Sequence, residues 1–380
     1  MSDSLEILLC TDYLPPSDGG VEHVVDQLAR RLAARGLSVG VFSLTDPGET
    51  IDLVDHPDVE VITARRIDLT DYVGLQSAVS PAAIRAFKQA LDSYDPEIVH
   101  VHNRFFFSSF LGLLYSFRYD YRLVTSLHLG RLDHLDQASR LAASAFQSTF
   151  SKQLVSRSDA LVCVSEAVAS VATALGGDPT KIHVAPNAVD VDRFAVESRA
   201  FDKTLLYIGR LVTNNGPQDL IEAIPDILAA HPEATIHLVG SGTLQETVNA
   251  EIDALGVGDS VATYGYVDDI TELYAAADIF CRPSYSEGLP LTLLESMATE
   301  TVPVVTPVAG SAEIVDDGSN GRLVDVGQPD AIADTVTELF DEPDRLTAMA
   351  STAKSYVEAN HSWEQRTQNV LGVYDEVQKL

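Results

Sequence analysis

The chain alternates short apolar runs rich in Val and Ile with helical patterns, and it does so in two series. The first series covers residues 6–165, and the second begins at residue 204, after a stretch at 181–203 in which the alternation stops. The candidate strands are EILLC, SVGVFSL, VEVIT, EIVHVH, RLVTSLH and ALVCVS, then TLLYIG, TIHLVG, SVATYG, DIFCRP and VPVVT. Apolar strands separated by helices predict parallel sheets covered by helices on both faces. The sequence therefore predicts two doubly wound, Rossmann-like α/β units.

Two units of this kind, facing each other, would enclose a cleft between the carboxyl ends of their strands, where ligands bind in this fold class. A chain of 380 residues also favours two domains over one. We expect an N-terminal domain over residues 1–190, a C-terminal domain over 203–360, and a last helix at 361–380 beyond the strands of the second unit.

The net charge of the chain limits the classes of partner that it can bind. The formal net charge is −31, and only six of the 25 basic residues are lysines. Nucleic-acid partners are excluded, because phosphate binding needs clustered Lys and Arg. Dispersed acidic residues and scarce lysines are typical of a halophilic protein, since molar salt shortens the Debye length to about 3 Å and screens self-repulsion. An acidic protein from an ordinary cell is the alternative.

Cysteine usage and the N-terminus indicate a cytoplasmic protein. Cys10, Cys163 and Cys281 lie far apart in apolar runs, with no metal or redox spacing, so we expect buried reduced thiols. The N-terminal residues MSDSLEILLCTD carry acids where a signal peptide needs basic residues. No run of about 18 apolar residues occurs, so no membrane span is expected.

The stretch SEGLPLTLLE at 286–295 places two glutamates around the start of a predicted helix. Gly288 allows a tight turn, and Pro290 suits the first helical position, because the N–H that it lacks would be unpaired there. Glu287 is then expected in a loop and Glu295 on the second helical turn. Two carboxylates beside free helical N–H groups predict a pocket for a ligand with hydroxyls and negative charge.

Three further positions follow predicted strands. Gly19 and Gly20 precede a helix near Val21 and would let an anion approach its N-terminus, although a simple turn is the commoner use of such a pair. Arg210 follows the strand TLLYIG and could clamp phosphate oxygens, or else pair with one of the many surface acids.

Histidines mark the carboxyl ends of two strands in the first series. His128 ends RLVTSLH, where it could bind a sugar hydroxyl or be a buried histidine of the core. His100 and His102 share one face of their strand, but no Cys, Asp or Glu accompanies them at ligand spacing, so we expect no metal site.

The aromatic stretch RFFFSSFLGLLYSFRYDYR at 104–122 has two interpretations. A helix there would normally pack on the sheet, which favours a role in the core. The flanking arginines leave a second interpretation, a peripheral contact with a membrane surface.

Together these segments resemble glycosyltransferase family 4, the retaining sugar transferases of the GT-B fold. The resemblance covers almost the whole chain, through DYLPPSDGGVEHVV, VSE, PNAVDVDRF, GRL and DIFCRPSYSEGLPLTLLESMA. The last segment is the most specific, because its two glutamates are separated by seven residues, as in the signature of the family. The resemblance implies a hexosyltransferase with a nucleotide-diphosphate sugar as donor and a glycan or lipid-linked acceptor.

The resemblance also assigns roles to single residues. It implies that Glu287 and His128 contact the transferred sugar, with Glu287 supporting charge at the reacting carbon. The expected donor-binding residues are Gly19, Gly20, Arg210, Asn215, Gly288, Leu289, Pro290 and Glu295. Of these, Glu295 would bind the ribose, and the glycine pair would approach the diphosphate. The family needs no cofactor and usually no metal, and its last helix crosses back to the N-terminal domain.

One departure from the family pattern concerns the diphosphate. Asn215 stands where the family usually has a lysine that pairs with this group beside the residue matching Arg210. A non-enzymatic alternative is therefore a sugar-nucleotide-binding relative that serves as a partner subunit. Another GT-B enzyme, such as a nucleotide-sugar epimerase, is a further alternative, against which the spacing of the two glutamates argues.

Overall fold

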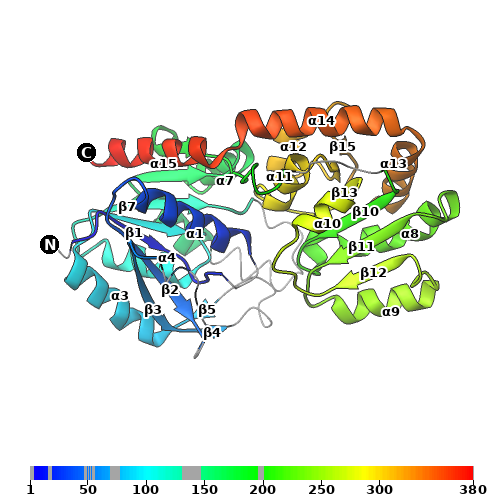
Figure 1. Cartoon of the computed structure of the whole chain (residues 1–380). Coiled ribbons are helices and arrows are strands. Elements are labelled where there is room, and N and C mark those ends of the chain that lie inside the picture. The colour runs from blue at the N-terminus through cyan, green and yellow to red at the C-terminus, as the bar shows by residue number, and fades with distance from the viewer. Residues whose placement is uncertain are drawn as a thin grey trace. The chain divides into compact units, whose positions relative to one another are not determined.

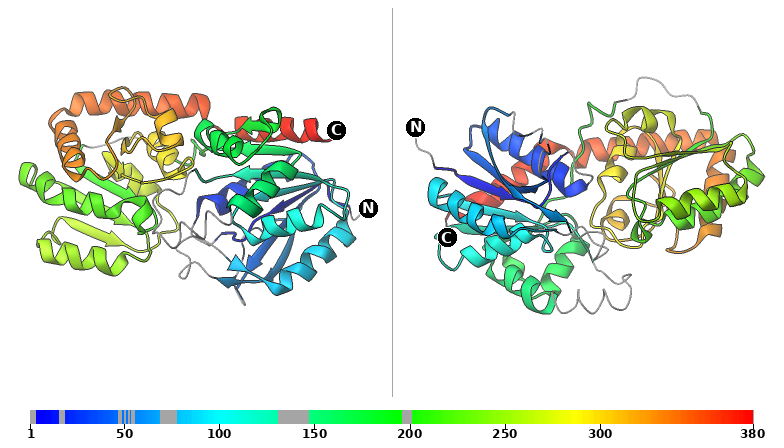
Figure 2. Two further views of the ribbon diagram at one scale, coloured as in Figure 1. Left: turned by 180° about the vertical axis from the view of Figure 1, so that it is seen from behind. Right: turned by 90° about the horizontal axis from the view of Figure 1, so that it is seen from below.

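The structure is a computed structural model, and its chain forms two compact units (Figures 1 and 2). Unit 1 comprises Met1–Pro186 and Arg366–Leu380, and unit 2 comprises Asn187–Gln365. The residues that the structure describes are 4–15, 19–46, 49, 51, 53, 56–68, 78–130, 147–195 and 201–379.

Unit 1 contains a parallel seven-stranded sheet with the order β3-β2-β1-β6-β7-β8-β9. Its strands are β1 (Ile7–Cys10), β2 (Val39–Thr45), β3 (Val59–Arg65), β6 (Ile98–His102), β7 (Arg122–Leu127), β8 (Ala160–Cys163) and β9 (Ile182–Val184), and a short hairpin pairs β4 (Ile67–Asp68) with β5 (Ala78–Val79). Its helices are α1 (Gly20–Ala33), α3 (Pro81–Tyr94), α4 (Phe107–Tyr115), η2 (Gln147–Ser151), α6 (Lys152–Arg157), α7 (Glu166–Ala174), η3 (Pro179–Lys181) and, from Arg366 onward, α15 (Trp363–Val377).

Strand β1, an inner strand of unit 1, shows why this sheet is covered on both faces. Successive β-strand residues point to opposite faces, so Ile7 and Leu9 join one core cluster while Leu8 and Cys10 join another. Buried residues of α1 and α15 belong to the first cluster, and buried residues of α3 and α4 belong to the second. The C-terminal helix therefore completes the core of the N-terminal unit.

Unit 2 repeats this architecture with a parallel six-stranded sheet of order β12-β11-β10-β13-β14-β15. Its strands are β10 (Thr204–Ile208), β11 (Thr235–Val239), β12 (Val261–Tyr264), β13 (Ile279–Arg282), β14 (Val302–Val305) and β15 (Arg322–Leu323). Its helices are η4 (Thr213–Asn215), α8 (Pro217–Ala230), α9 (Gln245–Leu255), α10 (Thr271–Ala276), α11 (Leu291–Ala298), α12 (Gly310–Ile314), α13 (Pro329–Asp341) and α14 (Pro343–Asn360).

The order of strands fixes where a ligand can bind in unit 2. The order reverses between β10 and β13, and such a switch point opens a crevice at the carboxyl ends of the two strands. The loops at 209–216 and 283–290 follow these two strands, and they carry most of the residues that the sequence singled out. The predicted α/β class with two doubly wound, parallel-sheet units is confirmed.

The structure also bears on the helix predicted over 135–157, on the cysteines and on membrane-spanning helices. The helix predicted over 135–157 lies partly outside the described residues, which show η2 and α6 from Gln147 onward. All three cysteines are buried and form no disulfide, as predicted. Within the described residues, no helix combines the length and the apolar character that crossing a membrane requires.

Candidate functional site

The loops that follow β10 and β13 are in direct contact. Gly216 has a φ of 73°, and a Cβ added to it would lie 2.0 Å from the carbonyl oxygen of Pro283, so only glycine fits there. Asn214 donates from Nδ2 to the carbonyl of Ser286 at 2.7 Å, and its own carbonyl accepts from the N–H of Tyr285 at 2.8 Å. The two loops therefore form one connected surface at the switch point.

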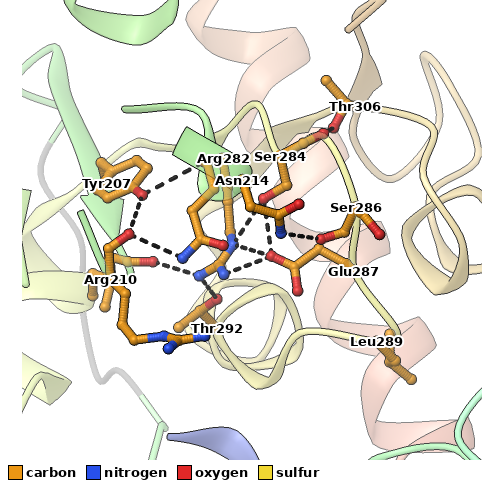
Figure 3. A network of polar contacts seen from close by, with 12 residues as sticks. Tyr207, Arg210, Asn214, Arg282, Ser284, Ser286, Glu287, Leu289, Thr292 and Thr306 are labelled. Carbon is orange, nitrogen blue, oxygen red and sulfur yellow. Dashed lines mark hydrogen bonds and ion pairs between the residues drawn. The ribbon is translucent and has the colours of Figure 1, made fainter. Parts of the chain in front are cut away.

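Glu287 lies in the second of these loops, as predicted, and is bound on one side only (Figure 3). Its Oε1 accepts from Nε of Arg282 at 2.9 Å, from Nη2 of Arg282 at 2.6 Å and from Oγ of Ser284 at 2.9 Å. Among the residues that the structure describes, none donates to Oε2, and Figure 3 shows this oxygen directed away from Arg282. A carboxylate oxygen thus remains able to accept from a ligand.

Arg282 was not among the residues predicted from the sequence, yet it connects the whole site. It ends β13, and its side chain is only 10% exposed. Its Nη1 donates to the carbonyl of Ile208 at 2.9 Å and to Oγ1 of Thr292 at 3.1 Å. A Cβ on Gly209 would lie 2.6 Å from Nη1, so this glycine leaves room for the guanidinium. An arginine at the end of an apolar strand was the available signal, because a buried guanidinium requires an acidic partner.

Four carbonyl groups of the loop at 284–290 accept hydrogen bonds within the protein, among them that of Ser286, which is bound by Asn214. The carbonyl of Ser284 accepts from Oγ1 of Thr306 at 2.5 Å. The carbonyls of Gly288 and Leu289 accept at 2.7 Å from the N–H of Gly310 and from Nδ2 of Asn187. The N–H groups of Gly288 and Leu289 donate to no residue in the described part of the chain. The loop therefore presents donors, which suits an anionic ligand.

Helix α11 begins directly after this loop, one residue later than the sequence predicts. Pro290 has extended backbone angles (φ −70°, ψ 134°) and is the N-cap, whereas a first helical residue was expected. The reason is that the carbonyls of residues 288 and 289 bond outside the helix, which keeps the chain extended up to Pro290. The N–H groups of the first turn of α11 thus point out of the same end of the helix.

Arg210 and Asn215 occupy opposite environments in the loop after β10. Arg210 is exposed, and within the described ranges no group forms a hydrogen bond or ion pair with its guanidinium. Asn215 is buried, and its Nδ2 donates to the carbonyl of Arg210 at 2.9 Å. The hydroxyl of Tyr207 donates to the same carbonyl at 3.2 Å. Asn215 therefore supports the backbone that presents Arg210.

Glu295 lies on the second turn of α11, as predicted, and is half-buried. The hydroxyl of Tyr274 donates to its Oε2 at 3.1 Å and to the carbonyl of Thr292 at 3.1 Å. Burial raises the pKa of Glu295 to about 7, against the opposing effects of the Tyr274 hydroxyl and of nearby arginines. This carboxyl group thus titrates close to neutral pH.

In unit 1, Gly19 and Gly20 stand at the start of α1. Gly19 is the N-cap and Gly20 the first helical residue. A Cβ on Gly19 would lie 2.1 Å from a carboxylate oxygen of Glu22, so the missing side chain leaves space for that carboxylate. The glycine pair therefore lies at a helix N-terminus, where it was predicted.

His128 follows β7 and belongs to a row of buried histidines. Its Nε2 lies 3.1 Å from Nδ1 of His102, which stacks on His100 with ring centroids 4.4 Å apart. His100 bonds to the hydroxyl of Tyr374 on α15 at 2.6 Å through Nδ1 and to Oγ of Ser126 at 2.8 Å through Nε2. Burial, together with the charges of Arg366 and His100, lowers the pKa of His128 well below 6.5, so the ring is neutral.

The hydrogen bond between His128 and His102 favours one arrangement of protons. Nε2 of His102 is buried and has no hydrogen-bond partner. An unpaired buried N–H is rarer than an unpaired acceptor, so His102 should carry its proton on Nδ1 and donate to Nε2 of His128. His128 then carries its own proton on Nδ1, which makes that atom a hydrogen-bond donor.

The predicted residues therefore gather in two places. In unit 2, Glu287, Gly288, Leu289, Pro290, Glu295, Arg210 and Asn215 lie around the ends of β10 and β13 and the start of α11. In unit 1, Gly19, Gly20 and His128 lie at carboxyl-end segments of that sheet. The described residues contain no group of three or more His, Cys, Asp or Glu side chains arranged to hold a metal ion.

Two family profiles cover most of the chain. The profile described as "Glycosyltransferase Family 4" matches residues 18–193, and that described as "Glycosyl transferases group 1" matches residues 189–356. A D-inositol 3-phosphate glycosyltransferase of Catenulispora acidiphila is 29% identical, over 94% of this chain and 90% of that protein. The enzyme of the same name from Xylanimonas cellulosilytica is 28% identical, over 95% and 92%.

Solved structures of similar fold extend over the whole chain. Sucrose-phosphate synthase of Thermosynechococcus elongatus superposes with a TM-score of 0.83 at 20% identity, covering 99% of both chains. HepE of Anabaena, solved with UDP and glucose, superposes with a TM-score of 0.78 at 20% identity, covering 98% of this chain and 99% of that one. These similarities establish the GT-B fold, and with the two profiles they show that the protein belongs to the group 1, family 4 glycosyltransferases.

Proposed function

We propose that the protein transfers a hexose from a nucleotide-diphosphate sugar to a glycan or lipid-linked acceptor, with retention at the anomeric carbon. The observation that carries the proposal is the loop at 284–290. Four of its carbonyl groups are bound within the protein, whereas the N–H groups of Gly288 and Leu289 and Oε2 of Glu287 have no partner among the described residues and are left for a ligand. N–H donors match phosphate oxygens, and a carboxylate oxygen matches sugar hydroxyls.

The reaction breaks the bond between the anomeric carbon and a phosphate oxygen, and the electron pair leaves with the diphosphate. The anomeric carbon gains a bond to the acceptor oxygen, and the proton of that hydroxyl passes to the departing phosphate oxygen. In this proposal, Arg210 and the N–H groups that precede α11 stabilise the negative charge of the leaving group. Glu287 supports the positive charge that develops on the sugar, and Glu295 accepts from the ribose hydroxyls.

Unit 1 supplies the remaining predicted contacts. We assign the diphosphate to the N-terminus of α1 at Gly19–Gly20, and the transferred sugar to His128. A neutral imidazole suits this role, because it can donate to a sugar hydroxyl without adding a charge. Since Arg210 and helical N–H groups neutralise the diphosphate in this mechanism, we expect turnover to persist in EDTA.

A panel of sugar nucleotides tests the donor. UDP-, GDP- and ADP-glucose are added in molar KCl, and the melting temperature and the release of nucleoside diphosphate are both measured. A ligand that binds only the folded state raises the melting temperature. At a concentration of 100 times its Kd, it increases the free energy of unfolding by about 2.7 kcal/mol. HepE was solved with UDP and glucose, and the curated relatives are named for D-inositol 3-phosphate, so UDP-glucose and D-inositol 3-phosphate are the first pair to test. A protein that none of these nucleotides stabilises would contradict the proposal.

A second candidate function is a subunit that binds the sugar nucleotide without transferring the sugar. The side chain of Asn215 favours it, because it adds no positive charge and is used to hold the carbonyl of Arg210. The same panel separates the two functions. A transferase releases nucleoside diphosphate from its donor, whereas a binding subunit is stabilised by the donor and releases none.

We also propose that the protein works at the cytoplasmic surface of a membrane. The exposed side chains Phe110, Leu114 and Phe117 recur at helical spacing along α4 and just beyond it. Beside Phe117 lies a pocket lined in part by Arg118, Arg122, Arg157 and Lys181. Residues 81–181 contain ten basic and nine acidic residues, whereas the rest of the chain contains 15 and 47. An apolar stripe beside cations in an acidic protein fits an anionic lipid surface.

Sedimentation with vesicles tests this surface. Vesicles of phosphatidylglycerol should carry the protein down, and vesicles of phosphatidylcholine should carry less. Phe117→Ser should weaken the binding, while Tyr266→Ser, at an exposed aromatic of unit 2, should leave it unchanged. Equal recovery of both variants on anionic vesicles would contradict the membrane assignment and leave the transferase proposal intact.

A further inference from the structure

The Arg282–Glu287 ion pair has an uneven geometry. An arginine usually binds a carboxylate with two parallel hydrogen bonds, one to each oxygen. Here both Nε and Nη2 of Arg282 donate to Oε1, as does Oγ of Ser284, and Oε2 receives none of these bonds (Figure 3). We propose that Arg282 is a positioning residue, which holds Glu287 so that Oε2 faces the sugar of the bound donor. This inference rests on the proposed function.

An ordinary structural ion pair in the same unit shows the contrast. Glu338 uses both carboxylate oxygens, accepting on Oε1 from Arg345 at 2.5 Å and on Oε2 from Arg322 at 3.0 Å. Its side chain is 42% exposed, whereas that of Glu287 is 13% exposed. The protein satisfies one oxygen of this largely covered carboxylate. Oε2 is not among the enclosed, unpaired side-chain atoms of the described residues, so solvent or a ligand can reach it. The second oxygen is therefore left for a ligand.

The guanidinium of Arg282 is itself held from three sides. Its Nη1 donates to the carbonyl of Ile208 at the end of β10 and to Thr292 in the first turn of α11. Arg282 itself ends β13, and the absence of a side chain on Gly209 makes room for Nη1. Glu287 is thus fixed relative to the ends of both strands at the switch point and to the helix that carries Glu295. A loop carboxylate acquires the rigidity that a reacting group requires.

Lysine cannot replace this arrangement. A single ammonium group could still pair with Glu287, but it lacks the planar fork that reaches Ile208 and Glu287 at the same time. Arg282→Lys should therefore keep a positive charge beside Glu287 but no longer fix the position of its carboxylate. Arg282→Met should lose both the charge and the positioning. The series Arg, Lys, Met separates the effect of charge from that of geometry.

The experiment compares the wild type with Arg282→Lys, Arg282→Met, Glu287→Gln and the double variant Arg282→Met/Glu287→Gln. Arg345→Met is the matched control, because it removes an arginine of unit 2 that pairs with glutamates away from the site. The glucose nucleotide that stabilises the wild type most is used as the donor, and the matching nucleoside diphosphate is used for calorimetry. Turnover, KM, nucleoside-diphosphate affinity and melting temperature are measured for each variant.

We expect Arg282→Met to lower kcat by about 100-fold, the size of effect produced when a reacting group moves by about 1 Å. Nucleoside-diphosphate affinity should stay within about twofold, which is the deviation seen between independent sites, because this ligand lacks the hexose that Glu287 contacts in the proposal. Arg282→Lys should fall between the wild type and Arg282→Met in kcat. Arg345→Met should match the wild type in all kinetic constants.

The double variant distinguishes positioning from general support of the fold. If Arg282 acts through Glu287, adding Arg282→Met to Glu287→Gln should change kcat by less than about twofold, since the two residues act as a unit. The double variant should also melt higher than Arg282→Met, because no carboxylate is left without its partner.

Three outcomes would overturn the inference. They are wild-type kcat in Arg282→Met, a loss of nucleoside-diphosphate affinity equal to the loss of kcat, and additive effects in the double variant. Equal losses of nucleoside-diphosphate affinity and of kcat would mean that Arg282 supports the whole loop rather than the carboxylate of Glu287 alone. A wild type that binds none of the nucleotides contradicts the proposed function itself, and the inference fails with it.

Discussion

At the scale of single residues, Arg210 and Arg282 show two environments of the same residue type at one site. Arg282 is buried and makes its bonds within unit 2, whereas Arg210 is exposed, and its guanidinium forms no hydrogen bond or ion pair with the described residues. Arg210→Ala should therefore lower nucleoside-diphosphate affinity by one to two decades, or about 1.5–3 kcal/mol for a hydrogen bond to a charged group. Calorimetry measures this loss. Arg345→Ala is the control, and equal affinities of the two variants would contradict the assignment of Arg210.

Glu295 gives the site a predicted dependence on pH. Its pKa is raised from an ordinary value near 4.5 to about 7, and the ionised form is the better acceptor for ribose hydroxyls. The KM for the donor should therefore rise as the pH falls from 8 to 6, and it should stay flat over this range in Glu295→Gln. A KM with the same pH dependence in both proteins would count against the ribose assignment.

The same shift predicts a stability difference of known sign. A folded-state pKa above the unfolded value means that the folded protein binds the proton more tightly. The stabilising contribution of this group is complete below about pH 4.5 and is lost as the pH rises through about 7. The melting temperature of the wild type minus that of Glu295→Gln should thus be smaller at pH 8 than at pH 4. Thermal scans of both proteins at both pH values measure this difference.

The sequence identified the two glutamates that lie around the start of α11, but not the residues that hold Glu287 in place. Glu287 and Glu295 stood out because two acids flank a glycine, a proline and an apolar run. Arg282 lies in the run DIFCRP, which reads as a strand, and its five hydrogen bonds reach residues as distant as Ile208. Contacts of this range depend on strand order, which local spacing does not encode.

At the scale of elements, α15 is held by an apolar face and by buried polar contacts of Arg366 and Tyr374. Val370, Val373 and Val377 pack in the core of unit 1, and the hydroxyl of Tyr374 bonds to His100 at 2.6 Å. Tyr374→Phe keeps the ring and leaves Nδ1 of His100 unpaired, which should cost about 1–3 kcal/mol of unfolding free energy. Urea unfolding followed by the fluorescence of Trp363, the single tryptophan, measures this cost.

Tyr266→Phe, at an exposed tyrosine of unit 2, is the control for this measurement. If the two variants unfold at the same urea concentration, the bond between α15 and His100 contributes nothing measurable. The helix is then held by its valines and by the hydrogen bonds from Arg366 to the carbonyls of Ala185 and Pro186.

Helices and strands with a clear hydrophobic periodicity were predictable from the sequence, but the residues at which they begin and end were not. The runs EILLC and TLLYIG form β1 and β10, because buried parallel strands are apolar on both faces. The aromatic stretch at 104–122 was assigned mainly to the core. The structure buries Phe106 and Leu111 but leaves Phe110, Leu114 and Phe117 exposed. Periodicity identified the helix there, but only tertiary packing decides which of its faces is covered.

At the scale of the whole molecule, the net charge of −31 should make stability depend on salt. At 0.1 M ionic strength the Debye length is about 10 Å, so carboxylates on neighbouring elements repel, whereas at 1 M it is about 3 Å. The melting temperature should therefore rise steadily from 0.1 to 2 M KCl. Sucrose at matched osmolality strengthens burial without screening charge and should stabilise less. A melting temperature that is the same at 0.1 and 2 M KCl would contradict this halophilic assignment.

The path of the chain has a consequence for synthesis on the ribosome. Residues 187–365 form one complete unit, while the core of unit 1 needs side chains from the last helix, as late as Val377. Translation proceeds from the N-terminus at about 5–20 residues per second. Unit 2 can therefore fold before the last residues emerge from the ribosome, whereas unit 1 has to wait for them. During that interval the face of the first sheet that α15 covers remains open to solvent, although its strands were made first. The part of the protein that is synthesised first is thus the last to be completed.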